Sequence, residues 1–142
     1  MDSVWTSAMA SLGGVPQFLL YFLAALLLVV VFLFLYTLVT PQRDVALIRQ
    51  GNTAAAISLG GALLGFAIPL SKSISQSHDL VDMVVWSTIA LIVQLGVFGL
   101  SGLVVAHEGE KITKGDTATA AFLAFASIGA GLVSAAAMTY GP

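Results

Sequence analysis

Four long stretches of the chain contain no Asp, Glu, Lys or Arg and consist mostly of apolar residues. They cover residues 16–42, 50–71, 83–107 and 117–142. Because about 20 apolar residues of helix cross a bilayer core, each stretch is long enough for one transmembrane helix. Strands of a membrane barrel alternate polar and apolar residues, whereas these runs are apolar on all sides. The pattern therefore predicts an all-α membrane protein with four transmembrane helices.

The four predicted spans differ in the face that they offer to neighbours. Residues 18–39 are uniformly apolar and suit a helix that faces lipid. Within 53–70, Gly61 and Gly65 are spaced to give a flat strip on which another helix can lie. We expect Pro69 to mark the end of that span, where a missing amide hydrogen costs least. The fourth span, 117–138, is rich in small residues and is expected to be interior.

The small residues of the fourth span recur at helical spacing. Ser127 and Gly131 lie one turn apart and share a face, so they are candidates for close packing against another helix.

The third predicted span, 83–105, carries Ser87, Gln94 and Ser101 at intervals of seven residues. Seven residues make nearly two helical turns, so these three side chains share one face. Gln94 lies in the middle of the span. Two interpretations stay open, and we favour the first: its amide bonds to another helix or subunit, or it lines a pore.

The amino-terminal residues 1–15 form a separate segment ahead of a four-helix domain at residues 16–142. Val4, Trp5 and Met9 fall on one side of a short helix, which suits a segment lying at the membrane interface. The alternative is a disordered amino terminus.

An internal repeat relates the two halves of the domain. Residues 48–65 align with 112–129 at an offset of 64, and eight of the 18 positions are identical. Each unit, 16–70 or 83–138, contains two spans, so both units enter the membrane in the same direction. We therefore expect two parallel repeats of a two-helix unit, with the two small-residue helices at the core.

Asn52 and Asp116 occupy matching positions just before the two small-residue spans. Asn and Asp are favoured helix caps because their side chains accept hydrogen bonds from the first amides of a helix. The alternative is an anion site made by these amides with Arg49 or Lys114.

The composition excludes several classes of protein. The 142 residues are 58% hydrophobic and 8% charged, whereas a soluble domain is about a quarter charged. Five Lys and Arg against seven Asp and Glu give no basic surface for a nucleic acid. The chain has no Cys, which excludes disulfides and thiolate metal sites.

The basic residues predict the orientation. Four of the five lie in the connections at residues 40–52 and 106–116: Arg43, Arg49, Lys111 and Lys114. Only Lys72 lies on the other side. Because short cytoplasmic loops carry an excess of Lys and Arg, both termini are expected on the outer side.

No candidate catalytic, cofactor-binding or metal-binding residues emerge. His107 and Glu108 begin a sequence that resembles a zinc motif, but Lys111 stands where the second His belongs. We interpret this stretch as a solvated loop. Ser58 and Ser127 are expected to bond to their own helix carbonyls. No enzyme activity and no cofactor are expected.

Several motifs resemble the YjfL/YshE family of small bacterial inner-membrane proteins, whose domain has unknown function. They are QGNTAAAISLGG at 50–61, GFAIPL at 65–70, Trp86, Gln94 and AAMTY at 136–140. The resemblance implies a multi-pass inner-membrane protein without an established activity. Relatives are often encoded near ATP-grasp ligases, polyamine enzymes or membrane-stress proteins, which implies a membrane partner for one of these.

Two hypotheses for function follow. The first is a non-enzymatic homo-oligomer in the lipid bilayer that acts as a channel-like or scaffolding subunit, with any pore between subunits. The second is an anchor for a soluble ATP-grasp, polyamine-related or membrane-stress protein. Such a partner would bind the cytoplasmic loops at residues 43–50 and 108–114.

Overall fold

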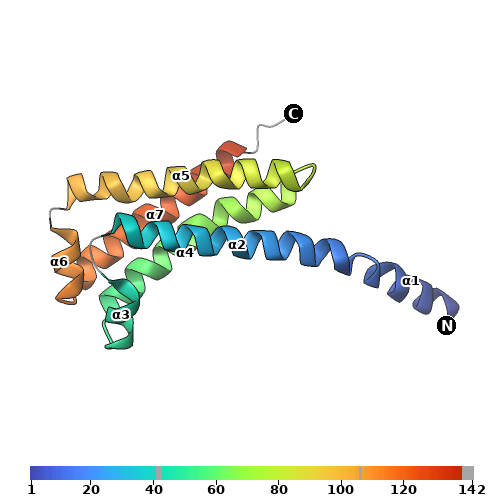
Figure 1. The fold of residues 1–142 in the computed structure, drawn as a ribbon, viewed down its shortest axis with the longest axis horizontal. Coiled ribbons are helices and arrows are strands. Elements are labelled where there is room, and N and C mark those ends of the chain that lie inside the picture. Colours follow the sequence, from blue (N-terminus) through green and yellow to red (C-terminus); the bar gives the residue numbers. More distant parts are fainter. Residues whose placement is uncertain (41–42, 106, 139–142) are drawn as a thin grey trace.

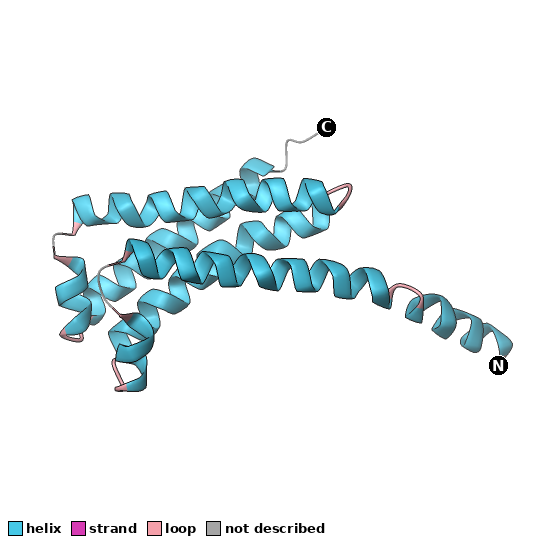
Figure 2. Cartoon of the chain, viewed as in Figure 1, coloured by secondary structure: helices cyan, strands magenta, loops and turns pink. Residues whose placement is uncertain are grey.

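The structure, a computed structural model, describes residues 1–40, 43–105 and 107–138 and is built from helices joined by short loops (Figure 2). The helices are α1 (Asp2–Leu12), α2 (Val15–Val39), α3 (Asp44–Arg49), α4 (Thr53–Gln76), α5 (Leu80–Val104), α6 (Glu108–Thr113) and α7 (Thr117–Ala137). No strand occurs in the part of the chain that the structure describes.

Four segments are long and apolar enough to cross a membrane. The first comprises α1 and α2, and the other three are α4, α5 and α7. The prediction of an all-α protein with four such helices is confirmed. Residues 139–142, which end the predicted domain and include Thr139 and Tyr140 of the AAMTY motif, lie outside the described residues.

Helices α4 and α7 form the core of the bundle and both begin at the end where α3 and α6 lie (Figure 1). Their contact depends on glycine. A methyl group built on Gly61 would collide with Ala124, and one built on Gly65 would collide with Ser127. A methyl group on Gly131 would in turn collide with the backbone of Gly65. The absence of side chains therefore lets the two backbones approach closely.

Helices α2 and α5 pack on the outside of this core. Helix α5 contacts both α4 and α7, whereas α2 contacts α4 and α5. Two aromatic contacts hold α2: Phe32 stacks on Phe66 with ring centroids 4.7 Å apart, and Tyr36 meets Phe98 edge-on at 4.8 Å. Apart from Ala25, Phe32 and Tyr36, the residues of α2 are partly or fully exposed, which suits a helix that faces lipid.

Helix α1 projects beyond the bundle, and Gly13 and Gly14 separate it from α2 (Figure 1). All of its residues are exposed. An interfacial position for residues 1–15 therefore stays a prediction.

Two expectations about element boundaries are wrong. Pro69 does not end its helix, because α4 continues to Gln76 with Pro69 inside it. The connections at residues 40–52 and 106–116 are also not simple loops, since the first contains the short helix α3 and the second contains α6. In α6, Gly109 and Ile112 are buried, so this segment packs against the bundle.

The two copies of the repeated motif form the same turn. Gly51 and Gly115 have φ of 87° and 85°, a conformation that favours glycine. Their amides donate to the carbonyls of Ile48 and Ile112, each at 2.9 Å. The wider repeat of two-helix units stays a prediction.

The packing predicts different effects of one substitution at two glycines that align in the sequence repeat. Gly65→Ala should lower the free energy of unfolding by about 1–3 kcal/mol, because the methyl group overpacks the contact with α7. Gly129→Ala, 64 positions later, should have little effect, because no atom lies within 4 Å of the new methyl group. Unfolding of both variants in a detergent titration would measure this. Equal stability of the two variants would contradict the described packing.

Candidate functional site: a buried polar cluster

The central polar contact of the bundle starts from Pro69. Proline has no amide hydrogen, so it cannot donate the usual helical bond to the carbonyl of Gly65, four residues earlier. The side chain of Gln94 from α5 supplies a donor instead, with its Nε2 2.9 Å from the Gly65 oxygen. This bond explains how α4 continues through Pro69, since neighbouring helices can satisfy carbonyls that a proline frees.

The other end of the Gln94 amide is also occupied. The hydroxyl of Ser127 in α7 donates to Gln94 Oε1 at 3.1 Å. Gln94 and Ser127 both have no solvent-exposed area. We call Gly65, Pro69, Gln94 and Ser127 the Gln94 cluster. It connects α4, α5 and α7 within one chain, so its geometry favours helix contact over pore lining.

The two serines that flank Gln94 at intervals of seven differ in their bonds. Ser87 donates to Ser73 of α4 at 3.1 Å, and Ser73 donates to the carbonyl of Met83 at 2.9 Å. Ser101 donates only to a carbonyl of its own helix, that of Val97, at 2.7 Å. Two of the three predicted positions, Ser87 and Gln94, therefore bond α5 to other helices.

One polar contact between helices was not anticipated from the sequence. The hydroxyls of Tyr36 in α2 and Ser58 in α4 lie 3.3 Å apart and are buried. Ser58 and Ser127 were expected to bond to carbonyls of their own helices, whereas the hydroxyls of both contact a side chain of another span. No local signal distinguishes these serines from Ser101.

Asn52 begins α4 and also connects it to α6. Its Oδ1 accepts from the amide of Ala55 at 3.0 Å, and its Nδ2 donates to the carbonyl of Ile112 at 2.9 Å. The side chain therefore acts as a cap and as a link between the two copies of the repeated turn.

Asp116 caps α7 at the matching position. Its Oδ1 accepts from the amides of Ala118 and Thr119, and its Oδ2 accepts from the Thr119 hydroxyl at 3.0 Å. The bonds from Thr119 hold the pKa of the Asp116 carboxyl below its ordinary value. Because the carboxylate already occupies these amides, the arrangement favours a cap over an anion site at α7.

Glu108 does not lie in a fully solvated loop as expected. It begins α6 and is partly buried. Burial disfavours the charged form, which raises the pKa of the Glu108 carboxyl. His107 has a left-handed φ of 58°. Its Nδ1 lies 4.0 Å from Oε2 of Glu110. Through its buried Gly109 and Ile112, this segment packs against α4 and α7.

The Gln94 cluster offers amide and hydroxyl groups, whose chemistry is hydrogen bonding. Among residues 1–40, 43–105 and 107–138, no group of three or more His, Cys, Asp or Glu side chains is arranged to hold a metal ion. The arrangement is therefore suited to fixing helices relative to one another in a setting without water.

Comparisons with known proteins point to one family. The family model described as "Domain of Unknown Function (DUF350)" matches residues 9–138. The chain is 36% identical over 129 residues to "UPF0719 inner membrane protein YjfL" of Escherichia coli strain K12, covering 91% of this chain and 98% of that protein. It is 28% identical over 138 residues to "UPF0719 transmembrane protein YshE" of Bacillus subtilis strain 168, covering 96% and 98%. No solved structure matches.

The Gln94 cluster predicts a cost for losing the amide. Gln94→Leu should lower the free energy of unfolding by about 1–2 kcal/mol, because it leaves the Gly65 carbonyl and the Ser127 hydroxyl buried without their partner. Ser101→Ala, on the same face of α5, is the matched control and should change little. Detergent unfolding of both variants provides the measurement. A Gln94→Leu variant as stable as the wild type would contradict this role.

Proposed function

The chain belongs to the DUF350 family, and we propose that it is a non-enzymatic, self-associating scaffold subunit of the bacterial inner membrane. The observation that carries this proposal is that both ends of the Gln94 amide are already hydrogen-bonded within the cluster. The one mid-membrane amide has no exposed area and has a partner at each end within the same subunit. Because both ends of this amide are occupied, Gln94 has no free group with which to line a transport route through a single subunit. The surfaces of the bundle are therefore the better place to look for function.

Self-association is supported by glycines that the subunit itself does not use. Gly96 and Gly99 lie on the outer face of α5, and no atom lies within 4 Å of a methyl group built on either. Gly61 and Gly65, by contrast, are required inside the bundle. Because glycines let membrane helices approach closely, the open pair on α5 suits a contact with a second copy.

The second part of the proposed scaffold role is the binding of a protein partner. We place this binding at the end of the bundle formed by α3 and α6. Asn52 links the two repeated turns, and a cavity of about 450 Å³ lies between them, lined by Gln50, Thr113 and Lys114 among others. We infer that this surface faces the cytoplasm. Four basic residues belong to α3 and α6 or to their caps: Arg43, Arg49, Lys111 and Lys114. Lys72 lies near the other end of α4, so the distribution agrees with the excess of Lys and Arg in cytoplasmic loops.

The proposed orientation can be tested with introduced cysteines, because the chain has none of its own. Ser75→Cys lies near the end of α4, and Thr113→Cys lies at the end of α6; both positions are exposed. A membrane-impermeant maleimide added to intact spheroplasts should label Ser75→Cys and should label Thr113→Cys only after lysis. The reverse pattern would invert the orientation.

Self-association can be tested by counting subunits with single-molecule photobleaching in vesicles. The wild type should form dimers or larger assemblies, and Gly96→Ile and Gly99→Ile should shift it towards single copies, because a branched side chain separates the helices. Gly60→Ile is the matched control, since Gly60 is an equally open position on α4.

Three outcomes would contradict the proposal. The first is a wild type that remains a single copy at every ratio of protein to lipid. The second is an equal loss of assembly in the Gly60→Ile control. The third is ion conduction by vesicles that hold single copies, because it would place a route inside the subunit.

A further inference from the structure

A cavity lies beside the turn between α4 and α5. Figure 1 shows this turn at the end of the bundle opposite α3 and α6. The volume of the cavity is about 330 Å³, which lies at the lower end of the range for small-molecule sites. The lining side chains that matter here are Ser73, His78, Asp82, Trp86 and Met138. The cavity is separate from the Gln94 cluster and from the glycines that we assign to self-association.

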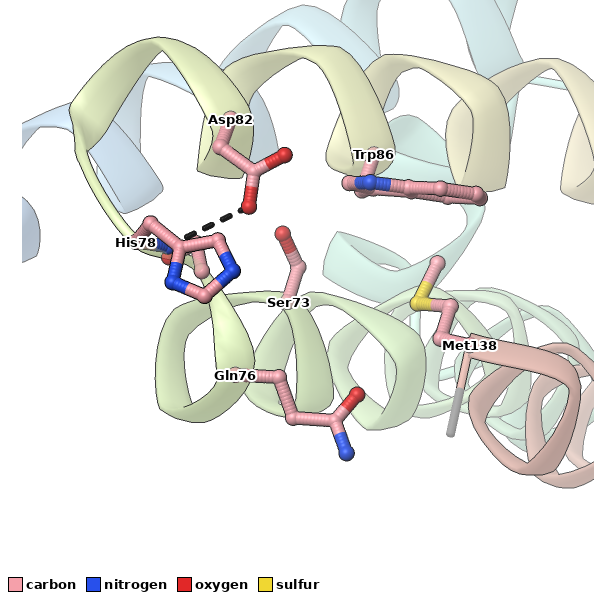
Figure 3. A pocket seen from close by; sticks show the side chains of 7 residues that line it. Ser73, Gln76, His78, Asp82, Trp86 and Met138 are labelled. Carbon is pink, nitrogen blue, oxygen red and sulfur yellow. Dashed lines mark hydrogen bonds between the residues drawn. The ribbon is translucent and has the colours of Figure 1, made fainter. Parts of the chain in front are cut away.

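Asp82 is held in place over this cavity by the start of α5. Its amide donates to Asp79 Oδ1 at 2.8 Å, and its Oδ2 accepts from the amide of His78 at 3.2 Å. Figure 3 shows this second bond and shows the other carboxylate oxygen directed towards Trp86. A pair of acidic residues in these positions also serves to cap a helix. The cap uses Oδ2 and leaves Oδ1 available to a ligand.

The lining favours a positively charged ligand. Among the described residues that line the cavity, Asp82 is the only Asp, Glu, Lys or Arg. Trp86 follows it by four residues on α5, so both side chains lie on the same face of that helix. The face of an indole ring attracts cations more strongly than other aromatic side chains do. A carboxylate and an indole face therefore act together on one cation.

The same lining favours an organic cation over a metal ion. Calcium binds six to eight oxygen atoms, and magnesium requires an octahedron of oxygen ligands. The Trp86 ring and the Met138 thioether, which face each other across the cavity (Figure 3), provide no such ligands. They suit instead the methylene groups next to an ammonium. We propose that this cavity binds the ammonium group of a small organic cation.

A second cavity, beside the first, suggests what is attached to that group. It has a volume of about 510 Å³, lies between α2 and α4, and is lined by Phe18, Phe22 and Ile74 among others. It shares Ser77 and His78 with the first cavity. A lipid with an ethanolamine headgroup could place its ammonium beside Asp82 and a chain along this apolar surface. A free alkylammonium would use the first cavity alone.

The test is a titration of the full chain in nanodiscs of phosphatidylglycerol, with Trp5→Phe so that Trp86 is the only tryptophan. The probes are n-butylammonium chloride and dihexanoyl phosphatidylethanolamine. Their counterparts without an amine are butan-1-ol and dihexanoyl phosphatidylglycerol. We expect a saturable change in Trp86 emission with at least one amine probe. Saturation by the lipid alone identifies a headgroup site, and saturation by butylammonium identifies a site open to free amines.

Asp82→Asn should weaken binding of the amine probe about tenfold or more, because it removes the charge that pairs with the ammonium. Asparagine can still accept the amide of His78, so the start of α5 is kept, which circular dichroism would verify. Asp2→Asn makes the same change in net charge far away on α1 and should leave the affinity unchanged. The proposal is overturned if neither amine saturates, if the counterparts without an amine bind equally well, or if Asp2→Asn and Asp82→Asn have the same effect.

Discussion

One backbone carbonyl, that of Gly65, is the constraint on which the packing of this bundle depends. Pro69 removes the donor that would normally satisfy it, and a bilayer offers no water to take its place. The Gln94 amide meets this need and draws α5 against α4. Because Gly65 and Gly131 have no side chains, α7 can approach closely enough for Ser127 to bind the other end of the same amide. Three helices are thereby positioned by a single polar side chain.

This arrangement assigns different roles to the inside and the outside of the subunit. The interior is closed and suited to stability. The exterior carries the features that remain available to other molecules: the open glycines of α5, the surface formed by α3 and α6, and the cavity beside Asp82 and Trp86. The proposed scaffold role would use this division, because a rigid unit can hold several surfaces in a fixed relation. The two ends of the bundle differ in the residues that line their cavities.

Much of the fold could be predicted from the sequence because lipid imposes simple rules. Charge-free stretches identified the four long helices, and runs of small residues identified α4 and α7 as the core. Contacts between distant side chains were harder to foresee. Tyr36 and Ser58 meet because of how α2 lies on α4, and nothing local to either residue indicates it. Gly65 and Gly129 occupy equivalent positions in the repeat, yet only Gly65 is buried. The counterpart of Gln94 in the first half is Val30, which offers no matching amide.

Pro69 shows why a local rule failed. A proline predicts the end of a helix when no other group donates to the carbonyl that the proline leaves without a partner. Here the donor is Gln94, 25 positions after Pro69. The most direct test of this account is a double-mutant cycle between Pro69→Ala and Gln94→Leu, with stability measured by detergent unfolding. Alanine restores the amide donor to the Gly65 carbonyl, so Gln94→Leu should cost at least about 0.5 kcal/mol less in the Pro69→Ala background. Additive effects, with a coupling below about 0.3 kcal/mol, would contradict the claim that Gln94 compensates for Pro69.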